Sequence, residues 1–306
     1  GLLRGALRAS AAGAVLLAWP GAVAMAQSSD PFPCSGPDPA SLEGPSAEAL
    51  RQMRELFPPT TDGHGMNVDD ALLIRYLRAR RWSVPKAEAL LRDTLEWRES
   101  FGVKEGVHGG AWLEQVRQES ATGKTYVRCI DEHGRAMVIM RPANETAHNH
   151  EGNLRNLVWQ MEKSIARMDA DERKREKILL IVDYQGFSLR NASPMRTSMA
   201  AAHILQNHYP ERLGKCYMVR APFVFSAVWG ALKPFIEPVT QAKVEFTSEP
   251  AEALREHIPM ERLEAPLDGE DAREFDVEAY FSGDLSEDLV QALDRRRAEA
   301  DPAPAS

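Results

Sequence analysis

Cysteine is scarce in this chain, which holds only 3 among its 306 residues. Cys34, Cys129 and Cys216 are far apart and odd in number, so they do not form the paired framework of a disulfide-rich secreted domain. No C-x-x-C pair is present to suggest a zinc site. This usage is typical of reduced thiols in a cytosolic protein.

Positive charge is also in short supply, with 37 Lys and Arg against 45 Asp and Glu and a net charge of −8 at pH 7. Binding to a phosphate backbone needs a clustered basic surface, so we expect no nucleic-acid partner. Net charge does not describe how charge is distributed, and local basic pockets remain compatible with it. With 43% hydrophobic residues, the chain fits one or two soluble domains with a sizeable core.

The common catalytic motifs are missing. There is no G-x-S-x-G nucleophile elbow, and no G-x-G-x-x-G follows a predicted strand. Gly123-Lys124-Thr125 resembles the end of a phosphate-binding loop, but Gln118 stands where its first glycine belongs, and a strand follows instead of a helix. The histidines lack an H-E-x-x-H arrangement, and Asp183 has no partner base or nucleophile in view. We therefore expect neither an enzyme nor a cofactor or metal site.

The N-terminal segment has features of a targeting sequence. Arg4 and Arg8 precede the apolar stretch 11–18, and the small residues at 24–26 resemble a cleavage site. Three interpretations stay open: a secretory signal, an organellar transit peptide, or a leader upstream of an initiator at Met25. Trp19-Pro20 interrupts the stretch, so a membrane span is not expected. Residues 27–45 are rich in Pro, Ser, Gly and Asp, which predicts a disordered linker.

Two periodicities follow one another along the rest of the chain. Helical spacing of apolar residues predicts a small bundle, with Asn67 or Asp69 as the cap of its second helix and Gly102 as the end of its third. Strands then alternate with helices, which predicts an α/β sheet with right-handed crossovers. The expected helices are 42–57, 70–81, 83–101, 153–168, 194–207, 223–235 and 286–298. The expected strands are 125–130, 136–141, 177–183, 215–219 and 242–246.

The predicted helix 223–235 carries large apolar side chains around much of its circumference, which needs a second apolar partner besides the sheet. That partner is either another core helix or a ligand tail or bilayer. The side chains are Phe223, Phe225, Val228, Trp229, Leu232 and Phe235.

Two stretches resemble a known family. YPERLGK, followed by APFVFSAVWGALKPFIEPVT and AKVEF, is similar to the lipid-binding domain of the CRAL-TRIO family. Upstream, DDALLIRYLRARRWSVPKAEALLRDTLEWRESFGV resembles that family's helical N-terminal module, and the similarity covers about residues 50–267.

The resemblance implies an α/β fold in which a helical bundle precedes a mixed β-sheet. The flanking helices of the sheet enclose an apolar lipid cavity with a mobile gate helix at 223–235. The resemblance divides the chain into a leader and linker (1–45), an N-terminal module (46–115), a lipid-binding domain (116–269) and a C-terminal extension (270–306).

The resemblance also implies a site for an inositol lipid headgroup. In phosphatidylinositol-transfer members a basic pair ends the LRAR helix, which corresponds here to Arg80 and Arg81. The glutamate that contacts the inositol there corresponds to Glu211, and the residues that hold the phosphate correspond to Thr240 and Lys243. Arg81 stands where lysine is common, and its planar fork also suits phosphate. Taken singly, the basic pair could be a solvated helix end and Lys243 a strand-edge charge.

The chain departs from family members that also carry phosphatidylcholine. Where those members place hydroxyl residues and tyrosines, this chain has Ile178 and Leu180 on the third strand and Val127 and Val138 on the first two. Apolar walls cannot hydrogen-bond a phosphate. We therefore expect a second ligand that is more hydrophobic, such as a sterol, a retinoid or a tocopherol-like molecule.

These inferences describe a cytoplasmic, peripheral-membrane and monomeric protein that sequesters phosphatidylinositol and a second apolar lipid and exchanges them at a transient membrane surface. One alternative is a carrier of a non-phosphorylated hydrophobic ligand, with basic residues that only dock on anionic membranes. The other is a lipid-sensing module that recruits a GTPase or a lipid kinase, for which helix 286–298 is the available feature.

Overall fold

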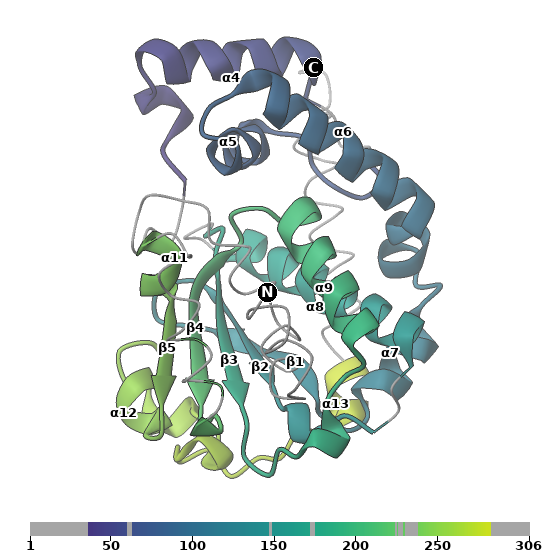
Figure 1. Ribbon diagram of the computed structural model, residues 1–306, viewed down its shortest axis with the longest axis vertical. Coiled ribbons are helices and arrows are strands. Elements are labelled where there is room, and N and C mark those ends of the chain that lie inside the picture. The colour runs from purple at the N-terminus through teal and green to yellow at the C-terminus, as the bar shows by residue number, and fades with distance from the viewer. Residues whose placement is uncertain are drawn as a thin grey trace, which may run out of the picture.

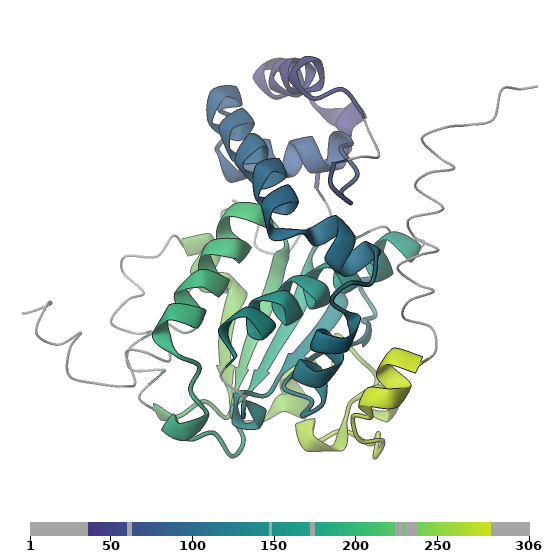
Figure 2. The same ribbon diagram turned by 90° about the vertical axis from the view of Figure 1, so that its right-hand side faces the viewer.

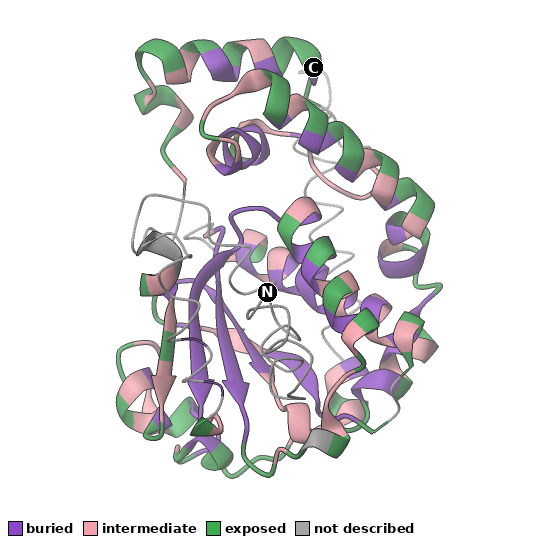
Figure 3. Ribbon diagram, in the orientation of Figure 1, coloured by how far each residue is buried: buried purple, intermediate pink, exposed green. Residues whose placement is uncertain are grey.

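Three helices form the N-terminal part of the computed structural model, which describes residues 36–59, 63–146, 149–171, 175–223, 225, 229 and 238–282. They are α4 (Gly44–Leu56), α5 (Asp70–Ala79) and α6 (Val84–Phe101). The Asp69 carboxylate accepts the N–H of Leu72 and caps α5, while Gly102 ends α6 in the left-handed conformation, at φ 77°. Seven of the ten residues of α5 are buried, because α4 and α6 both pack on it (Figures 1 and 3).

A five-stranded mixed sheet follows, with its strands in chain order: β1 (Thr125–Ile130), β2 (Ala136–Met140), β3 (Ile178–Asp183), β4 (Leu213–Val219) and β5 (Val244–Thr247). β1 and β2 pair antiparallel, and every later pair is parallel. The hairpin turns at Gly134, whose φ of 83° suits glycine, and Asp131 accepts the backbone N–H groups of His133 and Arg135. The predicted α/β architecture, a helical bundle followed by a mixed sheet with flanking helices, is confirmed.

Both faces of the sheet are covered, which explains the unbroken apolar run of β3. Ile178, Leu180 and Val182 pack in one core with α7 (Leu113–Ser120), α8 (His150–Ala170) and α9 (Met195–His208). Leu179 and Ile181 pack in a second core on the opposite face, away from the helices that lie in front of the sheet in Figure 2, with α12 (Pro250–Leu254) and the turns after it. Successive side chains of a strand alternate between faces, so a strand buried on both sides needs apolar residues throughout.

The remaining elements are short. They are η1 (Pro39–Ser41), η2 (Lys104–His108), η3 (Pro142–Asn144), η4 (Leu189–Asn191), α11 (Pro238–Lys243), η6 (Met260–Arg262), η7 (Ala265–Leu267) and α13 (Val277–Ser282).

The structure corrects the expected start of the fifth strand. Residues 242 and 243 belong to α11, and β5 begins at Val244. Lys243 therefore closes a helix instead of lying within a strand. Of the predicted gate helix, Phe223, Phe225 and Trp229 are described, whereas Val228, Leu232 and Phe235 lie outside the described residues, as does the predicted helix 286–298.

The first part of the predicted C-terminal extension packs against the body of the fold. Phe275 stacks on Tyr126 of β1, with 4.4 Å between ring centroids, and Phe281 is 9% exposed. The Tyr280 hydroxyl accepts the backbone N–H of Val127 at 2.9 Å and donates to Gln160 of α8 at 2.7 Å. Residues 271–282 thus contribute to the core beside the edge strand β1. Among the helices of the described residues, none combines the length and the apolar character needed to cross a bilayer.

Candidate functional site

Three ionisable residues stand immediately before three neighbouring parallel strands. Lys177 precedes β3, Glu211 lies two residues before β4, and Lys243 precedes β5. Because these strands are parallel, their N-terminal ends meet at one edge of the sheet. Glu211 Oε2 lies 3.3 Å from Arg78 Nη2 of α5 and 3.8 Å from Lys177 Nζ. Glu211 and Lys243 are almost completely buried, at 1% and 0% exposure.

Two of the predicted headgroup residues have an unusual backbone conformation. Glu211 and Arg81 are both left-handed, with φ of 62° and 52°, although neither is glycine. Such conformations cost roughly 1–3 kcal/mol each and concentrate at functional sites. Glu211 therefore combines a strained backbone with a buried carboxylate that lies within ion-pair distance of Arg78 and Lys177.

The basic pair that follows α5 lies closer to the surface. Arg81 is exposed, and Arg80 is partly exposed with its guanidinium donating to the carbonyl of Ala79. Thr240 lies in α11, one turn before Lys243. The structure thus brings Glu211 and Lys243 to one edge of the sheet and adds Arg78 and Lys177, which were not selected from the sequence.

A helical-face argument could have found Arg78. Arg75 and Arg78 are three residues apart, so they lie on the same side of α5. Arg75 is 7% exposed and ion-pairs with Glu176, just before Lys177. Basic residues on a buried face need carboxylate partners, which makes them stronger candidates for a structured site than basic residues past the helix end.

The predicted cavity residues divide into sheet and gate positions. Ile178 and Leu180 are 3% and 2% exposed on the face that carries α8 and α9. Phe225 is buried with its ring centroid 5.0 Å from that of Tyr184, and Trp229 is buried with its centroid 6.2 Å from that of Phe246. Phe223 is 85% exposed. The described gate residues therefore present apolar surface both inward to the sheet and outward to solvent.

A second buried charge cluster joins the helical module to the sheet domain. Arg98 of α6 donates two hydrogen bonds to Glu162 of α8, at 2.7 and 3.2 Å, and the Tyr209 hydroxyl donates to the same carboxylate at 2.7 Å. His108 Nε2 lies 3.5 Å from it. Burial alone would favour the neutral acid, but the adjacent Arg98 and His108 hold the pKa of Glu162 well below its usual value. Within the described residues, no three His, Cys, Asp or Glu side chains gather as a metal ion would require.

His208, beside this cluster, predicts a pH dependence of stability. Its ring stacks on Trp97 with a 4.2 Å centroid separation, and burial lowers the pKa of His208 to about 4 from 6.5. Between pH 6.5 and 4, the His208 imidazole becomes protonated in the unfolded chain but stays neutral in the folded chain. Its contribution to the free energy of unfolding is therefore complete above pH 6.5 and is lost as the pH falls to 4. We expect a fall of up to about 3 kcal/mol in the free energy of unfolding over that window, measured by urea titration.

The matched variants for this prediction are His208→Phe and His203→Gln. Phenylalanine keeps a ring against Trp97 but cannot be protonated, so this part of the pH dependence should disappear. His203 is exposed on the same helix, and its loss should leave the dependence in place. An unchanged pH profile in His208→Phe would show that His208 is not its source.

The chain matches two family models, described as "CRAL/TRIO domain" over residues 120–269 and "CRAL/TRIO, N-terminal domain" over residues 49–93. It is 31% identical to the SEC14 cytosolic factor of Eremothecium gossypii over 258 residues, which cover 80% of this chain and 83% of that protein. It is 28% identical to the phosphatidylinositol transfer protein PDR17 of Saccharomyces cerevisiae, covering 78% of this chain and 67% of that protein.

The chain spans only part of the length of some relatives. The SEC14 cytosolic factor of Yarrowia lipolytica is 30% identical, and the chain spans about half of it, 52%. Among solved structures, the fold is similar to the crystal structure of Sfh5, with a TM-score of 0.58 and 15% identity over 85% of this chain and 99% of that one. At this identity the structural likeness shows the fold alone.

Proposed function

This chain belongs to the CRAL-TRIO family, and we propose that it binds phosphatidylinositol and exchanges it with membranes. The observation that carries the proposal is that Glu211, paired with Arg78 of α5, and Lys243 are both buried charged residues that precede parallel strands of the sheet. Relatives named as phosphatidylinositol transfer proteins support it. We place the activity at the cytoplasmic surface of membranes and propose that it involves no bond chemistry.

The physical case for such a carrier is the cost of exposing hydrocarbon to water. Each methylene hidden from water is worth about 0.8 kcal/mol, so a diacyl lipid does not cross an aqueous phase unprotected at a useful rate. A cavity that opens against a bilayer avoids this penalty. Phe223, with its ring exposed at the start of the gate segment, suits contact with the bilayer surface.

The headgroup would bind at the edge of the sheet that holds Lys243. In this proposal Lys243, Thr240 and the pair Arg80 and Arg81 bind the phosphate, and Glu211 accepts hydrogen bonds from inositol hydroxyls. Arginine donates to phosphate in a bidentate manner, and hydrogen bonds to charged groups are the strong ones in proteins.

The second lipid is expected to be apolar. Val127, Val138, Ile178 and Leu180 are each at most 5% exposed within one apolar core. A phosphate placed against them would lose its hydrogen bonds to water and gain none. The same apolar face supports the alternative of a carrier for a non-phosphorylated ligand alone.

Transfer of phosphatidylinositol between vesicles tests the headgroup assignment. Lys243→Met keeps the length of the buried side chain and removes its charge. Because a charged hydrogen bond contributes about 1.5–3 kcal/mol, transfer should fall roughly tenfold or more. Lys86→Ala, at an exposed position of α6, is the matched control and should transfer normally. If a folded Lys243→Met protein transfers at the wild-type rate, Lys243 does not bind the headgroup.

A further inference from the structure

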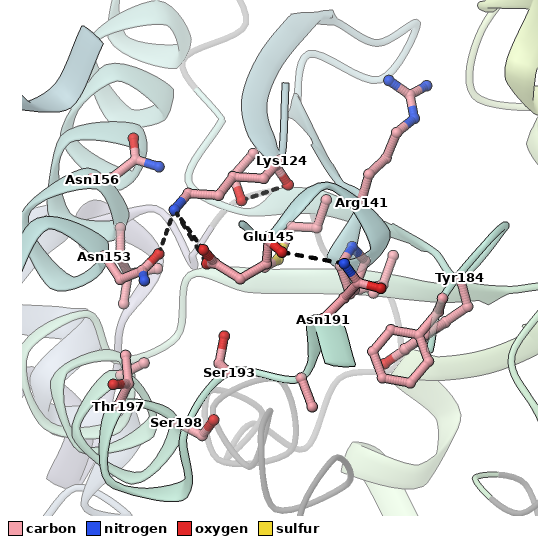
Figure 4. Close-up of a pocket in the computed structure, with 18 of the residues that line it drawn as sticks. Lys124, Arg141, Glu145, Asn153, Asn156, Tyr184, Asn191, Ser193, Thr197 and Ser198 are labelled. Atoms are coloured by element: carbon pink, nitrogen blue, oxygen red, sulfur yellow. Dashed lines mark hydrogen bonds and ion pairs between the residues drawn. The ribbon is translucent and has the colours of Figure 1, made fainter. Parts of the chain in front are cut away.

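We propose that a pocket at the C-terminal ends of the strands, opposite the end that holds Lys243, binds the uncharged polar end of an apolar lipid. That polar end is a hydroxyl or a carbonyl group. The pocket lies between α8 and α9, where β2 and β3 end, and with its open mouth it holds about 890 Å³ of space (Figure 4). The inference rests on the proposed carrier function, because this pocket would hold the polar end of the second lipid.

The cations that line this pocket are already engaged by carboxylates. Lys124 Nζ donates to Glu145 at 3.1 Å and to Asn153 Oδ1 at 2.7 Å (Figure 4). It also donates to Glu119 at 2.5 Å, so its three N–H groups are all used. Arg141 donates to Tyr126 and to Glu264, each at 2.5 Å. A phosphate entering here would find no free N–H on Lys124 and would meet the Glu145 carboxylate, while the Arg141 guanidinium points away from the other labelled side chains (Figure 4). The pocket therefore disfavours an anionic headgroup.

A chain of hydrogen bonds instead turns an amide donor into the pocket. The backbone N–H of Val127 donates to Tyr280 Oη, so the Tyr280 hydroxyl donates to Gln160 Oε1. This fixes the Gln160 amide, whose Nε2 donates to Asn156 Oδ1 at 3.1 Å. Ser120 Oγ donates to the same oxygen at 3.0 Å. With its oxygen occupied, Asn156, which is 3% exposed, presents its NH₂ group to the pocket (Figure 4).

Two further polar groups line the same pocket. The Asn153 oxygen accepts from Lys124, and its Nδ2 is buried without an acceptor among the described residues. Tyr184 is 6% exposed, and its hydroxyl has no hydrogen-bond partner in the described part of the chain. Burial raises the pKa of Tyr184 well above its usual value, so the hydroxyl stays a neutral donor.

These donors define the chemistry of the ligand. Buried N–H and O–H groups are normally satisfied, and the missing partner here is an uncharged oxygen acceptor. The remaining wall is apolar, through Met140, Leu157, Val182 and Phe187, which suits an adjoining hydrocarbon. Phe187 also lies 5.8 Å, between ring centroids, from Phe225 of the gate segment. The ligand class is therefore an amphiphile with an alcohol or carbonyl end, as in a long-chain alcohol or a sterol.

The test uses the full chain and three probes with one pyrene-labelled twelve-carbon tail: the alcohol, the alkane and the alkyl phosphate. Binding is followed by fluorescence titration of wild type, Asn156→Leu and Tyr184→Phe. The alcohol should lose roughly tenfold in affinity in Asn156→Leu, about the effect of one or two hydrogen bonds, and less in Tyr184→Phe. The alkane should bind both variants as it binds the wild type. The phosphate is titrated against Lys243→Met, which lacks the proposed headgroup charge, and should bind it more weakly than the alcohol does.

Three results would overturn the inference. The phosphate could bind Lys243→Met as tightly as the alcohol does, the alcohol and the alkane could respond alike to Asn156→Leu and Tyr184→Phe, or the alcohol could fail to bind. Tyr184→Phe removes one oxygen atom only, so it stays informative if Asn156→Leu fails to fold. Phosphatidylinositol transfer is measured on the same preparations. If the wild type does not transfer phosphatidylinositol, the proposed function fails. If it transfers normally but alcohol binding is unchanged in Asn156→Leu and Tyr184→Phe, only the present inference fails.

Discussion

Glu162→Ala is expected to lower the free energy of unfolding by about 3–5 kcal/mol, because it leaves Arg98 buried without its counter-charge. The Arg98 side chain is 1% exposed, so its guanidinium stays buried when the carboxylate is removed. The Tyr209 hydroxyl loses its acceptor in the same variant. Urea denaturation followed by circular dichroism measures the effect, as a lower midpoint at an unchanged slope.

Glu151→Ala is the matched control on the same helix. Glu151 pairs with Arg155 at 2.5 Å on the solvent side of α8, and exposed pairs of this kind contribute less than about 1 kcal/mol. The contribution of Glu162 should be complete above its ordinary pKa near 4.5 and should be lost as the pH falls below it, since its folded pKa is lowered. Equal losses in the two variants would contradict the role assigned to the buried cluster.

Ending the chain after Gly269 is expected to destabilise the fold by at least about 3 kcal/mol, the usual cost of removing one large buried aromatic side chain. The truncation removes Phe281 from the main core and Phe275 from its stack on Tyr126. It also leaves the N–H of Val127, on edge strand β1, without the Tyr280 hydroxyl. Thermal and urea unfolding of the truncated chain measure the loss.

A chain that ends after Ser282 is the matched control. It distinguishes the loss of the contacts made by residues 271–282 from the loss of the residues that follow them. It keeps α13 and its contacts, so it should be more stable than the chain that ends after Gly269 by the same amount. If the chain ending at Gly269 unfolds at the same urea concentration as the chain ending at Ser282, residues 271–282 do not stabilise the core as their contacts indicate.

Most of the secondary structure can be predicted because its causes are local. Strand β1 has the predicted bounds, and β3 differs by one residue, because apolar runs between turn residues define them. The fifth strand is different. Val239 and Ala242 continue an apolar pattern into Val244, so local spacing does not separate the helix α11 from β5. Helix α7, with eight residues, is too short for its periodicity to stand out.

The candidate site is less predictable, because it depends on which residues meet in space. The motif LRARR offers three nearby arginines with the same chemistry, and only the packing of α5 shows that Arg78 reaches Glu211. The pocket lined by Asn156 and Tyr184 is assembled from segments of α8, α9 and the ends of two strands. Neither residue belongs to a motif, and their orientation depends on partners as distant in sequence as Tyr280. The headgroup residues selected from the family resemblance remain a prediction.

The most direct test of the central claim is native mass spectrometry with lipid extraction on the full chain purified from a eukaryotic host. The account predicts that phosphatidylinositol co-purifies with the wild-type protein and is lost from a folded Arg81→Ala, Lys243→Met double variant. A wild-type protein that is empty, or that carries only a neutral lipid in both forms, would contradict the inositol-lipid assignment and would leave a carrier of apolar ligands.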